Sequence, residues 1–245
     1  MDSFRRLYVG GATFRLPDKE AVRDVIPKAR IYYQYGLTEA GPIVTRLRPE
    51  DMFNPDLDGS IGQEMLLNDV SIQGDDGAEL EDGVAGEICV RGPNVMLGYF
   101  NRPDATAAAF RAGWLRTGDL ASREGGYFMF RDRLKDMIKS GGENVYSAEV
   151  EQALYTHPAV AEAAVLGVAS DQWDEEVRAV VALKPGLAVT ERELQDHCRS
   201  RIAGYKVPKR ILLVALDQIP VNPSGKIMKR ELRRRSLWPD VVPTR

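Results

Sequence analysis

Two stretches in the first half of the chain alternate apolar and polar side chains, the period of a half-buried β-strand. They are Val70-Ser71-Ile72 and Gly86-Glu87-Ile88-Cys89-Val90-Arg91. Turn signals rich in Gly, Asp, Asn and Pro surround them, at 54–56, 74–77 and 81–83. This pattern predicts a small antiparallel β-barrel or sandwich. Farther on, the alanine-rich segment Asp104–Phe110 predicts a short helix, with Pro103 just before its start.

The last hundred residues follow a different pattern, in which helical and extended periods alternate. Ser147 is a suitable N-cap for a helix whose first turn is acidic, as the positive end of a helix dipole favours. Two β-rich runs follow this helix, Val160–Val168 and Val177–Leu183. The polar turn at Asp171–Glu176 between them predicts that they form a hairpin.

A capping box at Thr190-Glu191-Arg192-Glu193 predicts a second helix. The β-rich run Ile211–Val214 predicts a strand after it. The resulting order, α-β-β-α-β, describes a compact α+β unit. We therefore predict a boundary near Arg133–Asp136, with one domain at 1–133 and a second at 134–245.

The composition is that of an ordinary globular protein. The chain has 245 residues, of which 44% are hydrophobic and 28% charged, with a formal net charge of −3; this length suits one large domain or two modest ones. No apolar run approaches the ~18 residues that cross a bilayer. No apolar core follows the charges at the N-terminus, so no secretory signal is visible. We expect a cytoplasmic protein without a membrane span.

Cysteine and histidine usage agrees with that expectation. Cys89 and Cys198 are far apart and form no CxxC pair, which argues against a disulfide scaffold and fits a reducing compartment. The only histidines are His157 and His197, and neither neighbours a cysteine, so we do not expect protein-ligated zinc.

Positive charge gathers near the C-terminus. Residues 226–235 hold six basic side chains against Glu231. A nucleic-acid contact is one interpretation of such a run, and a solvated helix face is the other. The acidic balance of the remaining chain argues against a long basic groove, so we expect no nucleic-acid partner.

Two segments of the first domain carry candidate chemistry. Tyr32–Glu39 combines aromatic rings for stacking on a base, Thr38 as a donor to phosphate, and Glu39 as an oxygen ligand for Mg²⁺. A strand and turn with a buried tyrosine pair and a surface acid explains the same residues. Asp119 ends the segment Trp114–Asp119, where its carboxylate is suited to a ribose diol or is an ordinary turn aspartate.

Two loops of the second domain carry the remaining candidates. Gly141-Gly142 lets backbone N–H groups approach a phosphate or a thin chain without interference from a Cβ, or is a plain hairpin turn. Lys226 lies on a loop that ends in Gly-Lys. This loop is not a P-loop, because Ile227 is neither Ser nor Thr and Pro220 stands where the first glycine belongs.

Six segments of the chain, taken together and in order, are more specific than any one of them alone. They are Tyr35-Gly36-Leu37-Thr38-Glu39, Gly98-Tyr99-Phe100-Asn101-Arg102-Pro103, Arg116-Thr117-Gly118-Asp119, Asp132-Arg133-Leu134-Lys135-Asp136, Gly141-Gly142-Glu143-Asn144 and Pro223-Ser224-Gly225-Lys226-Ile227. In this order they closely resemble the adenylate-forming (AMP-binding) superfamily, which includes acyl-CoA synthetases. The resemblance covers nearly the whole chain, and within the superfamily it is strongest to fatty-acid or aryl acyl-CoA ligases.

The resemblance implies a two-step ligase. A carboxylic acid attacks the α-phosphate of ATP to give an acyl-adenylate, and the thiol of coenzyme A or of a carrier protein then displaces AMP. It further implies residue roles in the first domain. Tyr35 and Gly36 would bind the adenine nucleotide, Thr38 would contact the α-phosphate, and Glu39 would hold Mg²⁺. Asp119 and Arg133 would bind the ribose hydroxyls.

The same resemblance implies roles near and beyond the domain boundary. Lys135 matches the hinge about which the C-terminal domain rotates between the half-reactions. Lys226 matches the lysine that bridges carboxylate and phosphate during adenylation. Gly141 and Gly142 would face the pantetheine arm of the thiol, with Lys139 nearby.

The chain departs from the family pattern in one respect. It has no Ser/Thr/Gly-rich loop with a lysine for the β- and γ-phosphates, since Gly10-Gly11-Ala12-Thr13 is too short and matches a later family segment. We therefore interpret it as the C-terminal half of such a ligase, with a remnant of the large domain at its start. It would act alone or with a separately encoded N-terminal half. The alternative is a non-catalytic truncated paralogue that binds AMP, coenzyme A or a partner protein.

Overall fold

The computed structural model describes residues 3–223, 225–235 and 238. The chain divides into two compact units, Met1–Leu134 and Lys135–Arg245, and each combines helices with a mixed sheet, so the predicted α+β class is confirmed. No helix among these described residues is long and apolar enough to cross a membrane.

The first unit is built on one nine-stranded sheet with the order β1-β2-β3-β4-β9-β8-β6-β5, and β7 pairs with β8. Strands β1 and β2 are parallel, whereas the other pairs in this sheet are antiparallel. Among the described residues the path is open, so the expected small β-barrel is not confirmed. The elements are β1 (Arg6–Gly10), α1 (Leu16–Val25), β2 (Arg30–Tyr35), β3 (Thr45–Leu47), β4 (Ser60–Glu64), β5 (Asp69–Gln73), β6 (Gly86–Arg91), α2 (Pro103–Ala109), β7 (Phe110–Arg111), β8 (Trp114–Glu124) and β9 (Tyr127–Arg133).

Strands β5 and β6 confirm the predicted strands, but their half-buried pattern is wrong. Ser71 and Glu87, two polar members of the alternation, are buried together with their apolar neighbours, whereas Arg91 at the end of β6 is exposed. Both faces of these strands are therefore covered along most of their length, and the buried Glu87 carboxylate is stabilised by hydrogen bonds from Arg116 Nε and Gly118 N. Helix α2 is also confirmed, although Pro103 is its first residue, where a missing N–H costs nothing.

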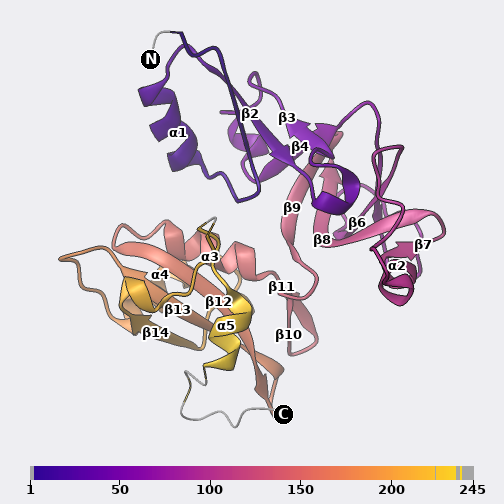
Figure 1. The fold of residues 1–245 in the computed structure, drawn as a ribbon. Helices are drawn as coiled ribbons and strands as arrows, with labels where there is room; N and C mark the ends of the chain where they lie inside the picture. Colours follow the sequence, from indigo (N-terminus) through magenta and orange to yellow (C-terminus); the bar gives the residue numbers. More distant parts are fainter. Residues whose placement is uncertain (1–2, 224, 236–237, 239–245) are drawn as a thin grey trace. The chain divides into compact units, whose positions relative to one another are not determined.

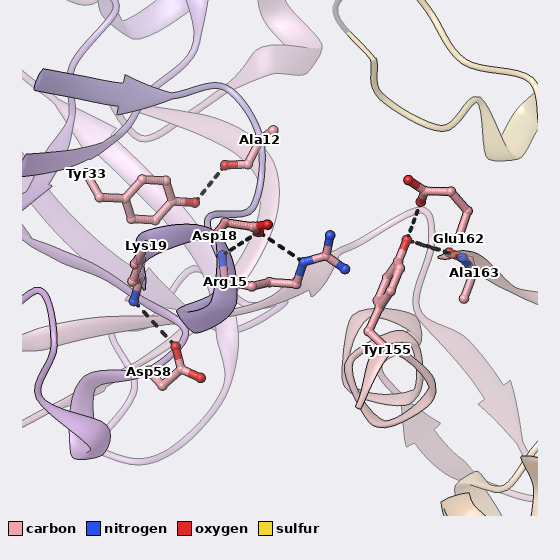
Figure 2. Close-up of polar contacts among 9 residues, drawn as sticks. All are labelled: Ala12, Arg15, Asp18, Lys19, Tyr33, Asp58, Tyr155, Glu162 and Ala163. Atoms are coloured by element: carbon pink, nitrogen blue, oxygen red, sulfur yellow. Dashed lines mark hydrogen bonds and ion pairs between the residues drawn. The ribbon is translucent and has the colours of Figure 1, made fainter. Parts of the chain in front are cut away.

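Helix α1, which the sequence pattern did not predict, lies beside β2 (Figure 1). Phe14, Ile31, Leu47 and Met52 form the core at this end of the sheet, and Val22 of α1 packs against them. Lys19 of α1 is almost fully buried and pairs with Asp58 at 3.4 Å (Figure 2).

The second unit contains a five-stranded sheet with the order β11-β10-β13-β12, and β14 pairs in parallel with β13. The predicted α-β-β-α-β order is confirmed as α3-β12-β13-α4-β14. A hairpin precedes this core, and a helix follows it. The elements are β10 (Ile138–Ser140), β11 (Glu143–Val145), α3 (Ser147–Tyr155), β12 (Val160–Ser170), β13 (Asp174–Leu183), α4 (Glu191–Arg199), β14 (Arg210–Val214) and α5 (Lys229–Arg234).

Alternating side chains of β12 and β13 build two cores on opposite faces of this sheet. Val165 and Val181 face α3 and α4, whereas Leu166 and Val180 pack with Leu232 of α5. At the start of β12, the hydroxyl of Tyr155 donates to Glu162 at 2.6 Å (Figure 2).

Three local predictions in this unit meet different outcomes. The capping box is confirmed, since the Thr190 hydroxyl accepts from the Glu193 N–H at 3.2 Å. The hairpin is confirmed with a tighter turn, because its second strand already begins at Asp174. The N-cap assignment of Ser147 is wrong: Tyr146 is the N-cap, and the Ser147 hydroxyl accepts from the Lys229 ammonium at 2.6 Å instead.

Candidate functional site

Three residues predicted to bind a nucleoside come together in the first unit. Tyr35 ends β2, Asp119 lies on β8, and Arg133 ends β9 directly opposite Asp119. The Tyr35 hydroxyl donates to Asp119 Oδ2 at 2.8 Å. Arg133 Nε lies 3.6 Å from Asp119 Oδ1. One carboxylate thus joins a tyrosine that is remote from it in sequence and an arginine on the neighbouring strand.

The surroundings of the Tyr35 hydroxyl keep it protonated. Burial, and then the negative charge of Asp119, raise the pKa of Tyr35 well above its ordinary value, so the phenol stays a donor. The side chain of Asp119 is 14% exposed and that of Arg133 is 39% exposed. A carboxylate has about four lone-pair sites, so Asp119 can accept from a ligand hydroxyl in addition to Tyr35.

The loop after Tyr35 requires a glycine. A Cβ on Gly36 would lie 2.2 Å from the carbonyl oxygen of Pro42, because the chain folds back there and Val44 N donates to Tyr35 O at 2.8 Å. Thr38, the first residue of the short 3₁₀ helix Thr38–Ala40 in this loop, is exposed.

Glu39, the expected Mg²⁺ ligand, lies in the same 3₁₀ helix. Its Oε1 accepts from the Tyr99 hydroxyl at 2.9 Å, and this hydrogen bond raises the pKa of Tyr99. Within the described residues, no group of three or more His, Cys, Asp or Glu side chains is suited to hold a metal. A single carboxylate fits Mg²⁺ only where phosphate oxygens and water complete the coordination, which is the usual arrangement for Mg²⁺ with a nucleotide.

In the second unit, Gly141 and Gly142 form the two-residue turn between β10 and β11. Their φ angles are +60° and +84°, and a turn of this kind needs positive φ at both positions. A Cβ on Gly141 would lie 2.9 Å from Cε3 of Trp173, and Gly141 N donates to Trp173 O at 2.8 Å. Lys139, on β10 beside this turn, is exposed, and its N–H donates to Glu175 at 2.8 Å.

Lys226 lies on a loop closed by Asn222. The Asn222 side chain accepts from Lys226 N at 2.9 Å, and Asn222 N donates to Lys226 O at 2.9 Å. Gly225, with a φ of +81°, turns the chain between them. Ser224 of the same motif lies outside the described residues.

The predicted hinge residue Lys135 is exposed and lies in the turn between the two units. On one side, Leu134 N donates to Gly118 O at 2.8 Å within the first unit. On the other, Asp136 pairs with Arg233 at 3.0 Å within the second unit. Lys135 is therefore flanked by residues anchored in different units.

Sequence reasoning did not assign roles to three residues that contact the candidate site residues. Tyr99 bonds to Glu39, Trp173 packs on Gly141, and Glu87 holds the backbone just before Asp119. Tyr99 belongs to one of the six motif segments, which was the available signal. Trp173 and Glu87 are brought close by strand pairing, which no local pattern reveals.

Comparisons with known proteins show which family this chain belongs to. The sequence profile of the AMP-binding enzyme matches residues 1–100, and that of the AMP-binding enzyme C-terminal domain matches residues 149–226. The chain belongs to the AMP-binding enzyme family. The resemblance to adenylate-forming enzymes is thereby confirmed.

The relatives of this family member are ligases. Feruloyl-CoA synthase from Amycolatopsis sp is 44% identical over 236 residues, which are 96% of this chain and 47% of the relative. Among solved structures, o-succinylbenzoate CoA synthetase from Bacillus subtilis with an acyl-adenylate intermediate is 38% identical, with a TM-score of 0.84 over 95% of this chain and 46% of that one. The same enzyme with ATP and magnesium ion gives 0.83, with 38% identity over 95% and 47%. The chain spans about half the length of the curated relatives it matches.

Proposed function

We propose that this chain carries the nucleoside-binding part and the C-terminal domain of an ATP-dependent acid–thiol ligase. The reaction joins a carboxylic acid to ATP as an acyl-adenylate with release of pyrophosphate, and a thiol then displaces AMP. The thiol is that of coenzyme A or of a carrier protein. The observation that supports this most directly is the meeting of Tyr35, Asp119 and Arg133, since a phenol ring, a carboxylate and a guanidinium match adenosine.

The first unit would hold the nucleotide. Asp119 and Arg133 would take the ribose hydroxyls, Tyr35 and Gly36 the adenine side, and Thr38 the α-phosphate, which its exposed position allows. Glu39 would contribute one carboxylate oxygen to Mg²⁺. When bound, this ion would neutralise phosphate charge and orient the phosphates.

The second unit would serve both half-reactions as a mobile domain at 134–245, turning at Lys135. Lys226 would place a cation beside the reacting carboxylate and phosphate during adenylation, where it stabilises charge that develops in the transition state. Lys139, Gly141 and Gly142 would line the path of the pantetheine arm. The first domain, 1–133, would contain the small β-barrel, and a separately encoded N-terminal half would complete the enzyme in the cytoplasm.

Calorimetry with AMP, ATP–Mg²⁺ and an acyl-adenylate analogue tests the proposal. We expect AMP or the analogue to bind more tightly than ATP, because the chain lacks a Ser/Thr/Gly-rich loop with lysine for the outer phosphates. Asp119→Ala should lower the AMP affinity by about tenfold or more, the loss typical of one charged hydrogen bond. Asp82→Ala is the matched control, because Asp82 also pairs with an arginine, at 2.7 Å from Arg123, but is exposed elsewhere in the unit.

Pyrophosphate exchange with a panel of carboxylic acids then distinguishes an active ligase from a non-catalytic paralogue. Exchange by the chain, alone or with a supplied N-terminal half, supports the ligase. AMP binding without exchange in either case supports the non-catalytic paralogue. Equal AMP affinity of the parent and of Asp119→Ala contradicts the nucleoside site.

A further inference from the structure

The pairing of β8 with β6 is interrupted by a bulge that contains Asp119. In the pairing of β6 with β8, Glu87 lies opposite Leu120, and Cys89 lies opposite Arg116. Three residues of β8, 117–119, therefore oppose Ile88 alone. Gly118 adopts a φ of +72° within this bulge. Bulges bend a strand and re-aim its side chains, and they are common beside functional sites.

The carboxylate of Glu87 holds the bulge from β6. Its Oε1 accepts from the Gly118 N–H at 2.9 Å, and its Oε2 accepts from Arg116 Nε at 2.8 Å. The side chain is only 8% exposed. One buried carboxylate thus bonds to both flanks of Thr117.

Thr117 adds a second pair of bonds inside the bulge. Its hydroxyl donates to the carbonyl oxygen of Ile88 at 2.8 Å and accepts from the Asp119 N–H at 3.1 Å. The backbone of Asp119 is therefore tied to β6 while its carboxylate bonds to Tyr35 on β2. The direction of the Asp119 side chain depends on the shape of the bulge.

A buried carboxylate is costly to desolvate and destabilises a fold unless its hydrogen bonds are satisfied. An apolar residue at position 87 would be buried without that cost, as is Cys89, two positions on and on the same face of β6. The carboxylate at this position has a local use, because it accepts an N–H group that the bulge withdraws from ordinary strand pairing.

We propose that Glu87 is a positioning residue of the nucleoside site: by holding the bulge at residues 117–119, it aims the Asp119 carboxylate at Tyr35 and at the ligand's ribose. This proposal rests on the proposed function for the identity of the ligand. The aim of Asp119 at Tyr35 is testable without any ligand.

Four variants isolate the role of the carboxylate. Glu87→Met keeps the length of the side chain but removes both bonds, and Glu87→Asp withdraws the carboxylate by one methylene. Glu87→Gln retains an oxygen that accepts from Gly118 N and should rescue the site. Glu79→Gln is the matched control, because it makes the same change at an exposed glutamate paired with Arg123.

The first measurement uses no ligand. The ¹³Cζ resonance of Tyr35, assigned through Tyr35→Phe, reports the hydrogen bond to Asp119, and Asp119→Ala supplies the value for the broken bond. We expect Glu87→Met to shift the resonance toward that value, and Glu87→Gln and Glu79→Gln to leave it unchanged. A resonance unchanged in Glu87→Met overturns the proposal. If that variant fails to fold, Glu87→Asp gives the same test.

The second measurement is the AMP affinity of the same variants. Glu87→Met should lose about tenfold, as expected when one charged contact is misplaced, and Glu87→Gln should stay within about twofold of the parent. Failure of the parent to bind AMP refutes the proposed function, while the tyrosine resonance still decides the role of Glu87. If Glu79→Gln loses as much AMP affinity as Glu87→Met, the loss comes from removing a negative charge anywhere in the unit. That result overturns the proposal.

Discussion

Tyr35 and Asp119 are separated by 84 positions in the sequence, and their hydrogen bond of 2.8 Å is the contact on which the candidate site is built. Burial keeps the phenol protonated, so it acts as a fixed donor to one oxygen of the carboxylate. The guanidinium of Arg133 lies 3.6 Å from the other oxygen of this carboxylate. A carboxylate held in this way is preorganised, because it loses little freedom when a diol binds.

Lys226 provides a test at the residue scale. Lys226→Ala should lower acyl-adenylate formation by about 10²–10³, the usual loss when one preorganised charge partner is removed. Thioester formation from preformed adenylate should be nearly unchanged, because the lysine is proposed to act only in the first step. The two half-reactions are measured separately, on the chain with a supplied N-terminal half.

Arg230→Ala is the control for Lys226→Ala, because it removes an exposed cation four positions away in α5. It should leave both half-reactions at the parent rate. Equal losses in both half-reactions of Lys226→Ala contradict the proposed role.

At the scale of elements, the β10–β11 turn supplies a matched pair of glycines. Both have positive φ, so alanine at either position costs about 1–2 kcal/mol. Only at Gly141 would the added Cβ also meet Trp173, at 2.9 Å, whereas nothing lies within 4 Å of a Cβ on Gly142. Gly141→Ala should therefore lower the urea midpoint more than Gly142→Ala and change the fluorescence of Trp173. Identical urea midpoints and spectra for the two variants would show that the Trp173 side chain moves aside at no cost in stability.

The contact between α3 and α4 predicts a pH dependence. Burial, assisted by the positive charges of Arg201 and His157, lowers the pKa of His197 below its ordinary value of 6.5. The unfolded chain therefore binds a proton at a pH where the folded chain does not, and the folded state is favoured as the pH rises. Urea unfolding should show stability increasing from about pH 5 to 7.

His197→Gln tests this origin, because it removes the titrating ring but keeps an amide that can bond to Thr156, whose hydroxyl lies 2.8 Å from His197 Nε2. The rise in stability between these pH values should become smaller. A slope as steep as that of the parent assigns the effect to other groups.

At the scale of the whole molecule, the testable feature is the link at Lys135. Brief trypsin treatment should cut after Arg133 or Lys135 and release a folded fragment that begins near Asp136, because Lys135 is exposed between residues anchored in different units. Mass spectrometry and circular dichroism of the fragment check this. Absence of cleavage between 125 and 147, or unfolding of the fragment, contradicts a hinge between two independent domains.

Lys135→Pro extends the test to motion. Proline holds φ at about −65° and removes one N–H, so both units should stay folded while rotation at the link is restricted. We expect one half-reaction to be impaired more than the other. Equal rates of both half-reactions, relative to the parent, contradict the proposed rotation.

The sequence by itself determined the features that depend on neighbouring residues. The capping box at Thr190, the Gly141-Gly142 turn and the order of elements in the second unit each rest on contacts within a few positions, so composition and spacing suffice to predict them. The ordered motifs likewise identified the family. The prediction that Ser147 is the N-cap of α3 was wrong, because its hydroxyl bonds to Lys229, a partner 82 positions away.

Only the tertiary structure decided how remote residues meet. The meeting of Tyr35, Asp119 and Arg133 depends on the strand order and on the register of β8 with β9, and the aim of Asp119 depends on a bulge held by Glu87. The burial of Lys19 likewise depends on how α1 packs on the sheet. Pairing between distant segments is a property of the folded chain as a whole, because a shift of one residue turns a side chain to the opposite face.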